Sequence, residues 1–286
     1  MELGMLRVFQ AVAKEGGVSK AAEKLHYVQS NVTARVRQLE DELGTQLFYR
    51  KSRGMSLTPA GKVLSGYADK LLGLAEEAER AVKEEEGHWG PLAIGSLNSV
   101  ASINLPTLLA KFHAQNPQVE INLITAQVDE LVEKVLDYSL EGAFINGPMV
   151  HPDLKAHLAF EQELVLVHRK GDTVLKKDEP PQQVLVFPNQ CCPHRGRLEQ
   201  YLQDKGQVLH GATELGSLEA ILGCVAAGMG VSLLPLAAVE LSSSRDKLAV
   251  KRIPAKYARL NIVFVRRKDV LMTRGLQAFL ETIKQD

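Results

Sequence analysis

The sequence predicts an α + α/β chain with a small helical unit, one long linker helix and two α/β lobes. Three observations predict it. Helical repeats fill residues 3–43, an unbroken helical pattern runs from Pro59 to Glu86, and short apolar runs alternate with helical patterns after Pro91. We therefore place the domains at 1–58, 59–87 and 91–286, with the last one divided into two lobes.

The composition is that of a folded protein with one basic region. Of the 286 residues, 45% are hydrophobic and 24% are charged, and Lys+Arg and Asp+Glu both number 34. Residues 1–62, however, contain ten Lys/Arg and six Asp/Glu. A basic module on a neutral chain indicates an anionic partner.

The sequence shows no sign of a membrane or secreted protein. It lacks an apolar run of membrane-spanning length, and its start, Met1-Glu2-Leu3, lacks the features of a secretory signal. Three cysteines cannot all pair with one another, so we interpret them as reduced thiols. We expect a cytoplasmic protein with no membrane partner.

Residues 3–57 predict three helices followed by a hairpin. Gly16-Gly17 should end the first helix, Ser19 should cap a second helix that runs to Leu25, and Gly44 should end the third. The apolar side of the third helix is formed by Val32, Val36, Leu39 and Leu43. The hairpin is expected between Leu47-Phe48 and Leu57, with its turn near Ser52-Arg53-Gly54.

The opposite side of the third helix is small, polar and basic. Its residues are Gln29, Ser30, Asn31, Thr33, Ala34, Arg37 and Gln38. Small residues let a helix enter the major groove, where amides and arginine reach base edges. Arg50 and Arg53 near the hairpin tip are placed to meet phosphates. A polar helix face alone could simply be solvated, but the helix spacing together with a basic hairpin favours a winged helix-turn-helix that binds double-stranded DNA.

The long helix carries an apolar stripe. Thr58 suits its N-cap and Pro59 its first position. The stripe steps by three and four residues through Leu64, Tyr67, Leu71, Leu74 and Ala78, which is the spacing of a coiled-coil seam. We expect it to pair with a second subunit; packing on its own domain is the alternative.

The remaining residues alternate between strand and helix patterns. The first lobe is expected to contain Leu92–Ser96, Ile103–His113, Val119–Thr125, Glu130–Tyr138 and Gly142–Asn146. The second is expected to contain Val184–Phe187, Arg197–Gln203, Leu218–Ala227, Val231–Leu234, Leu260–Val265 and Met272–Ile283. This βαβαβ order predicts largely parallel sheets.

The first 65 residues resemble a known family. The run Phe9, Ala11, Val12, Ala21-Ala22, Leu25, Gln29, Thr33, Leu39-Glu40, Leu43-Gly44, Leu47-Phe48, Arg50, Arg53, Leu57-Thr58 and Ala60-Gly61 resembles the signature of LysR-type transcriptional regulators. The resemblance implies a homodimer or tetramer on pseudo-palindromic operators, two lobes similar to type 2 periplasmic binding proteins, a small-molecule co-inducer between them, and RNA polymerase as a further partner. Val28 and Ser30 depart from the usual Ser and Pro around Gln29, and Thr33 stands where Ser is usual. The operator sequence therefore cannot be carried over from the family.

Candidate effector residues follow the predicted strands. In α/β lobes, ligands bind beyond the carboxyl ends of the strands. The resemblance places the effector pocket there by position. The candidates are Asn98, Ser99, Ser102, Thr125, Asn146, Cys191, Cys192, His194 and Arg195. Any one of these polar residues could instead be a helix cap.

The stretch Cys191-Cys192-Pro193-His194-Arg195 leaves three interpretations open. It could form a pocket wall in which Arg195 binds an anionic effector. It could also be ordinary packing. In the third interpretation it is a redox or metal sensor, in which His194 and Arg195 place positive charge beside a reactive thiol. The spacing does not fit a usual metal site, so we expect no metal and no cofactor other than the effector. Cys224 should lie in the core.

Two other classes of protein were weighed. The C-terminal half alone would suit a solute-binding module, but the basic N-terminal unit disfavours that interpretation. An enzyme such as a Rossmann dehydrogenase lacks the required glycine fingerprint, and no catalytic constellation emerges from the sequence. The sequence thus favours a ligand-responsive transcription regulator, with a thiol-based regulator as a variant of it.

Overall fold

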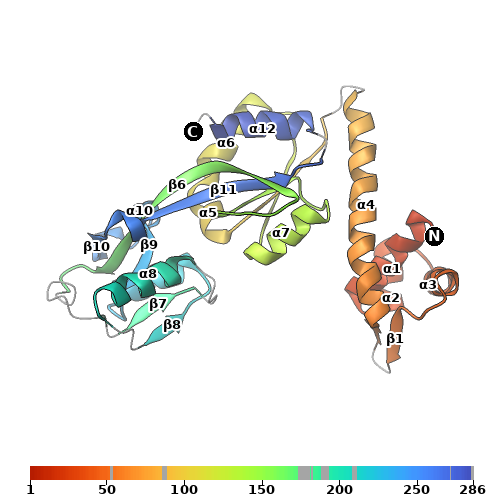
Figure 1. Ribbon diagram of the computed structural model, residues 1–286, viewed down its shortest axis with the longest axis horizontal. Coiled ribbons are helices and arrows are strands. Elements are labelled where there is room, and N and C mark those ends of the chain that lie inside the picture. The colour runs from red at the N-terminus through yellow and green to blue at the C-terminus, as the bar shows by residue number, and fades with distance from the viewer. Residues whose placement is uncertain are drawn as a thin grey trace.

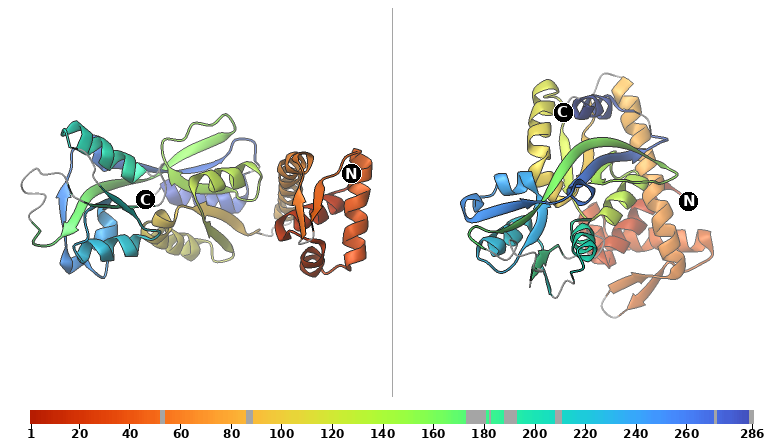
Figure 2. Two further views of the ribbon diagram at one scale, coloured as in Figure 1. Left: turned by 90° about the horizontal axis from the view of Figure 1, so that it is seen from below. Right: turned by 60° about the vertical axis from the view of Figure 1, so that its left-hand side comes forward.

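The computed structural model describes residues 1–51, 54–85, 89–172, 181, 183–187, 193–207, 211–270 and 272–284. The chain forms an elongated molecule. A helical N-terminal unit and the long helix α4 (Pro59–Glu85) lie at one end, lobe 1 lies in the middle, and lobe 2 lies at the other end (Figures 1 and 2). None of the helices in these ranges is both long and apolar enough to span a membrane.

The N-terminal unit has the predicted winged helix-turn-helix architecture. Its elements are α1 (Leu3–Glu15), α2 (Val18–Leu25), α3 (Gln29–Leu43), β1 (Phe48–Lys51) and β2 (Gly54–Leu57). Gly16 and Gly44 end α1 and α3 in the left-handed conformation, as expected. The expected Ser19 cap is wrong, because α2 begins at Val18 after Gly17 and has no side-chain cap.

The core of this unit confirms most of the predicted apolar face of α3. Val32, Val36 and Leu39 are buried, and the rings of Phe9 and Phe48 pack with centroids 5.2 Å apart. Leu43 was predicted to join them, but it is 42% exposed. The last turn of α3 extends past the core, so its apolar periodicity continues without a partner.

The hairpin is fixed against the turn between α1 and α2. The amide of Met55 donates a hydrogen bond to the carbonyl of Gly16 over 2.8 Å. Gly54 has φ +125°, and a Cβ there would lie 2.5 Å from the same carbonyl oxygen. Glycine is therefore required at this position for the wing to approach the helices this closely.

Helix α4 starts where the sequence predicts. The Thr58 hydroxyl accepts a hydrogen bond from the amide of Gly61 and donates one to the carbonyl of Gln46, so it caps α4 and ties it to the unit. Ala68 and Leu72 are buried against the core of the N-terminal unit. The first half of α4 is therefore part of that unit.

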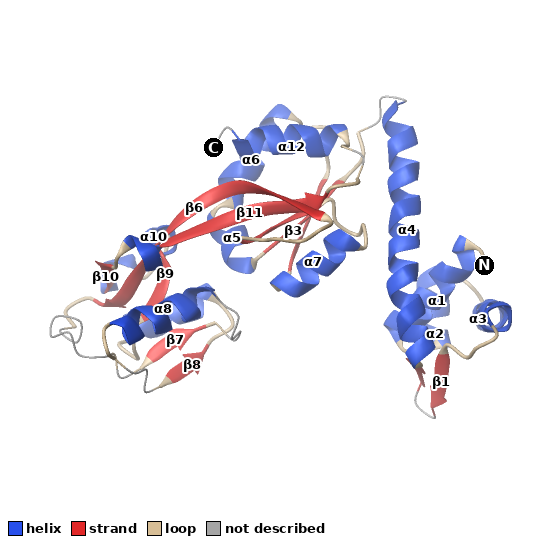
Figure 3. Cartoon of the chain, in the orientation of Figure 1, coloured by secondary structure: helices blue, strands red, loops and turns tan. Residues whose placement is uncertain are grey.

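The two lobes are built from short elements and two long strands (Figure 3). Lobe 1 contains β3 (Leu92–Ser96), α5 (Asn98–Ile103), α6 (Leu105–Gln115), β4 (Ile121–Thr125), α7 (Val128–Leu136), β5 (Gly142–Asn146) and α12 (Arg274–Lys284). Lobe 2 contains β7 (Val184–Val186), α8 (Pro193–Asp204), β8 (Ala212–Glu214), α9 (Leu218–Ala226), β9 (Ser232–Pro235), α10 (Leu236–Glu240), β10 (Leu248–Arg252) and α11 (Ala255–Ala258). The strands β6 (Leu154–Arg169) and β11 (Arg259–Arg267) run between the lobes.

The sheets are mixed, which corrects the expectation of largely parallel sheets. In the described part of the chain, β4, β3 and β5 are parallel, whereas β11 pairs antiparallel with both β5 and β6. The sequence did not predict β6. Its first half is mostly exposed or half-buried, and full burial without alternation is confined to Leu164–Val167, so no single period marks it as one strand.

The predicted helix Ile103–His113 corresponds to α6, and a separate short helix, α5, precedes it. Helix α5 ends at Ile103 and α6 begins at Leu105, with Asn104 between them and Pro106 in the first turn of α6. The core of lobe 1 beneath α6 and α12 contains Phe112 and Phe279, whose rings meet edge to face at 5.2 Å.

Candidate functional site

The polar face of α3 is open to solvent. Gln29, Ser30, Ala34, Arg37 and Gln38 are exposed, and Asn31 and Thr33 are half-buried. The opposite side of the helix holds the N-terminal unit together. In the part of the chain that the structure describes, no side-chain hydrogen bond or ion pair holds Arg37 or Gln38. Both side chains can therefore reach an external ligand.

Two residues on this face make contacts within α3. The Asn31 carboxamide oxygen accepts a hydrogen bond from Nε of Arg35 over 2.9 Å, and the Thr33 hydroxyl donates to the carbonyl of Gln29 over 2.9 Å. The Arg35 guanidinium also lies 5.7 Å from the ring centroid of Tyr27. These contacts preorganise Asn31, whose NH₂ group remains a donor for a base edge.

A hollow of about 630 Å³ lies beside α3. Its lining residues are Glu15, Gly16, Gly17, Val18, Ser19, Lys20, Thr33, Val36, Arg50, Gly54 and Met55. The hollow brings the first turn of α2, one edge of α3 and the base of the wing to one surface. Lys20 and Arg50 supply positive charge there, as contact with a phosphate backbone requires. The sequence predicted Arg50 but missed Lys20; Arg53 lies outside the described residues.

The apolar stripe of α4 is exposed within one chain. Tyr67, Leu71 and Leu74 are 62%, 39% and 49% exposed, and Ala78 is exposed as well. Leu64 does not belong to this stripe, because it packs against the core of the N-terminal unit. Val63, which the prediction omitted, is exposed on the same side one turn before Tyr67.

The parallel strands of lobe 1 bring four predicted effector residues to one edge. Ser96, at the end of β3, pairs in register with Thr125 and with Phe144. Asn98 and Ser99 begin α5 directly after β3, and Asn146 ends β5. Asn98, Ser99, Thr125 and Asn146 therefore share the carboxyl edge of the sheet. The Ser102 hydroxyl turns back into α5 and donates to the carbonyl of Asn98.

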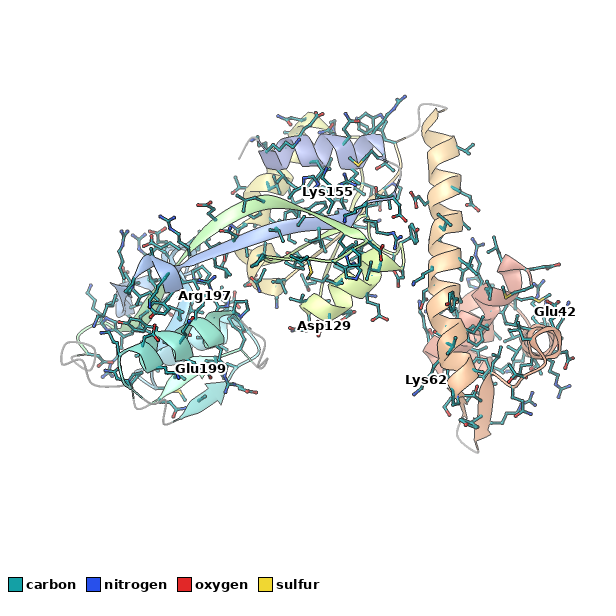
Figure 4. All side chains as sticks on the ribbon, viewed as in Figure 1. Glu42, Lys62, Asp129, Lys155, Arg197 and Glu199 are labelled. Carbon is teal, nitrogen blue, oxygen red and sulfur yellow. The ribbon has the colours of Figure 1, made fainter. Side chains whose placement is uncertain are left out.

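The positive charge of Arg195 is paired with two carboxylates within lobe 2. Its guanidinium contacts the carboxylates of Glu199 at 2.8 Å and Glu214 at 3.1 Å. The hydrogen bond to Glu199, which Figure 4 labels on α8, raises the pKa of Arg195. This pairing disfavours the predicted role of Arg195 as the receptor of an anionic effector, because both nearby acids already compensate its charge.

His194 is buried and uncharged. Burial, together with the nearby charge of Arg197, lowers the pKa of His194 from 6.5 to about 4. Its ring centroid lies 5.9 Å from that of Phe187. This low pKa disfavours the expectation that His194 carries positive charge. Cys191 and Cys192 lie outside the described residues. Cys224, predicted to lie in the core, is half-buried and packs against the core of lobe 2.

Sequence reasoning missed a buried polar contact at the junction of the lobes. Nε2 of Gln162 on β6 donates a hydrogen bond to Oδ1 of Asn104 over 2.6 Å, and Gln162 is buried. Because β6 itself was not predicted, its middle residue gave no signal. Within the described ranges, no group of three or more His, Cys, Asp or Glu side chains is placed to hold a metal ion.

Comparisons with known proteins agree along the whole chain. Residues 3–62 match the family model for bacterial regulatory helix-turn-helix proteins of the lysR family, and residues 85–286 match the LysR substrate binding domain. GltR of Bacillus subtilis, an HTH-type transcriptional regulator, is 43% identical over 282 residues, covering 98% of this chain and 95% of that protein. YofA of Bacillus velezensis, of the same description, is 42% identical over 284 residues, covering 99% and 98%.

Solved structures support the same fold. A full-length OxyR variant from Pseudomonas aeruginosa has a TM-score of 0.74 at 23% identity, covering 99% of this chain and 95% of that one. CbnR in complex with its target DNA has a TM-score of 0.73 at 23% identity, covering 100% and 99%.

Replacing Arg37 tests the exposed face of α3. We expect Arg37→Ala to weaken specific operator binding by about 1–3 kcal/mol if the guanidinium reads a base. Arg7→Ala removes an equal charge from the exposed surface of α1 and serves as the control. Titrations by fluorescence anisotropy measure both variants; equal losses for the two would exclude base reading by Arg37.

The buried imidazole of His194 predicts a pH-dependent stability. The pKa of His194 is lower in the folded protein than the value of 6.5 in the unfolded chain. The neutral imidazole therefore makes its full contribution to the free energy of unfolding above pH 6.5, and this contribution is lost as the pH falls toward 4. The loss should reach roughly 3 kcal/mol at pH 4. Urea unfolding of His194→Phe should show a shallower decline over this range, while His113→Gln, on the exposed surface of α6, should decline as wild type does.

Proposed function

The chain belongs to the LysR family of DNA-binding transcriptional regulators with an effector-binding domain, and we propose that it reads a pseudo-palindromic operator with one α3 helix from each subunit of a dimer. One observation carries this proposal. The apolar side of α3 is buried in the N-terminal unit, while the side chains of Arg37 and Gln38 face solvent. Recognition helices divide their two faces in the same way.

Charge and shape around α3 support the same mode of binding. Lys20 and Arg50 flank the hollow beside α3, and the N-terminal residues carry an excess of basic side chains. Phosphate contacts from these residues would set the position of the unit on the duplex, and side chains of α3 would then select the sequence. Affinity should fall steeply as salt rises, because phosphate contacts release counterions.

The exposed stripe of α4 supports a dimer. Tyr67, Leu71 and Leu74 form a continuous apolar surface that remains open within one chain. Such a stripe at coiled-coil spacing is stabilised when a second helix covers it. A dimer through α4 would carry two winged units, which matches the two half-sites of a pseudo-palindrome.

We place the small-molecule effector at the carboxyl edge of β3, β4 and β5. Asn98, Ser99, Thr125 and Asn146 offer amides and hydroxyls there. These groups suit a ligand with hydrogen-bonding groups at the entrance between the lobes. RNA polymerase as a partner and a cytoplasmic location follow from the role of a regulator on DNA and remain predictions.

A charged residue in the α4 stripe should separate the subunits. Leu71→Asp places a carboxylate in the predicted seam, where it would be buried without a partner, whereas Leu71→Met keeps the seam apolar. Light scattering should report a lower mass for Leu71→Asp alone, and a gel shift with the upstream region of its own gene should show weaker binding of that variant. An unchanged mass would rule out the seam.

Two substitutions distinguish an effector site at the carboxyl edge of β3, β4 and β5 from a site at Arg195. A thermal-shift screen of small metabolites should identify compounds that stabilise the wild-type protein. We expect Thr125→Val, which removes a hydroxyl without adding volume, to lose most of that stabilisation, and Arg195→Ala to keep it. The reverse result would place the ligand beside α8 instead.

A further inference from the structure

The residue that precedes α3 is unfavourable in two respects. Val28 is the N-cap of α3, with extended backbone angles (φ −77°, ψ 146°), and its side chain makes no capping hydrogen bond. An apolar, β-branched residue is among the poorest at this position, because it has no oxygen to accept a hydrogen bond from the amides of the first turn. Val28 is also 67% exposed. The sequence therefore gives up a stabilising cap and places an apolar side chain in water.

Packing within the described part of the chain does not compensate for these two costs. Val18, at the start of α2, packs against the core of the N-terminal unit, whereas Val28 belongs neither to that core nor to the apolar residues around it. Figure 1 shows α3 on the side of the unit that is turned away from lobe 1. A residue that breaks a local rule without a gain in its own fold is expected to serve a function.

The backbone holds Val28 in a defined place. Its carbonyl accepts hydrogen bonds from the amides of Asn31 over 3.0 Å and Val32 over 3.3 Å. On the other side, the amide of Tyr27 donates to the carbonyl of Ala22 over 2.9 Å, which closes the end of α2. The branch at Cβ leaves the valine few side-chain rotamers. Two methyl groups are thus presented at one point, with little conformational freedom left to lose on binding.

Val28 adjoins the polar face that we assign to DNA. The exposed residues Gln29 and Ser30 follow it directly, and Tyr27, which is 44% exposed, precedes it. Recognition helices contact base edges with the residues at their N-terminal end. An exposed side chain at that end of α3 would therefore lie at the bases when α3 enters the major groove.

A valine can recognise one feature of a base pair in the major groove. Its side chain neither donates nor accepts hydrogen bonds, so it cannot read the donor and acceptor pattern of the bases. The C5 methyl group of thymine is the apolar group that base edges present there. We propose that Val28 contacts the C5 methyl group of a thymine in each operator half-site and is thus a specificity-determining residue. This inference rests on the proposed function, because it requires α3 to lie in the major groove.

The contact is tested by removing the methyl groups of either partner. In the footprinted duplex from upstream of the protein's own gene, deoxyuridine in place of one thymine at a time keeps the base pair and removes only the C5 methyl group. In the full-length protein, Val28→Ala removes both γ-methyl groups, and Val28→Ser does so while supplying a capping oxygen. Val150→Ala removes the same groups from a residue between β5 and β6 that is 94% exposed, and serves as the control.

Anisotropy titrations compare every pair of protein and duplex. For wild type and Val150→Ala, deoxyuridine at one thymine of a half-site should weaken binding by about three- to fivefold, the size expected for one buried methyl group. For Val28→Ala and Val28→Ser, the same replacement should change the affinity by less than about 1.5-fold, because the partner of the methyl group is already absent. Val28→Ser should also raise the melting temperature, because serine can cap α3.

Wild-type protein that binds the duplex but tolerates every deoxyuridine replacement would overturn the contact, as would an equal loss for wild type and Val28→Ala. A lower melting temperature of Val28→Ser would show that the valine stabilises the fold, and the proposal would then fail as well. Wild-type protein that leaves the upstream region unbound would instead refute the proposed function, so the two failures are distinguishable.

Discussion

The structure depends on a single helix, α4, which packs against the N-terminal unit and lobe 1 and leaves a third, apolar face open. Ala68 and Leu72 are buried in the N-terminal unit, Leu71 belongs to the open apolar stripe, and Gly73 sits on lobe 1. Neighbouring residues on a helix point in directions about 100° apart, so six consecutive positions are enough to serve all three. A rigid helix cannot rotate to change its contact with the N-terminal unit without also changing its contact with lobe 1 and the direction of its open face.

This constraint explains the division of roles on α3. The winged unit is held through its apolar core and the Thr58 cap, both of which lie on the α4 side. Arg37 and Gln38, on the opposite face, are consequently exposed to solvent. The wing is held separately, by the hydrogen bond between Met55 and Gly16. The exposed polar surface and the structural core are thus formed by opposite sides of the same short elements.

Features that depend on neighbouring residues could be predicted from the sequence. The helix ends at Gly16 and Gly44 and the cap at Thr58 follow from local backbone chemistry. The apolar face of α3 was predicted except for Leu43, since periodicity does not show where the partner surface ends. The exposed polar face of α3 could be predicted because its residues follow the periodicity of a single helix.

Features that depend on residues far apart in the chain could not be predicted from the sequence. Arg195 was predicted to bind an anionic effector; its partner Glu199 lies one turn along the same helix, but its second partner, Glu214, lies 19 residues away on β8. The same applies to Gln162, whose partner Asn104 lies in lobe 1. Two glycines seven residues apart in α4 were a visible signal, but only the tertiary contact separates the buried Gly73 from the open Gly66.

The packing between the lobes limits how an effector can act. Val184 and Leu233 of lobe 2 belong to the same buried apolar cluster as Phe144 of lobe 1, and Ile103 at the end of α5 packs against the second cluster of lobe 2. Wide opening would expose this shared surface at about 25 cal/mol per Å², so a small pivot about β6 and β11 is favoured. A ligand at the proposed site beside Asn98 would contact the first turn of α5, and the last residue of α5, Ile103, packs against the second cluster of lobe 2. Such a ligand can therefore shift the lobes without a large closure.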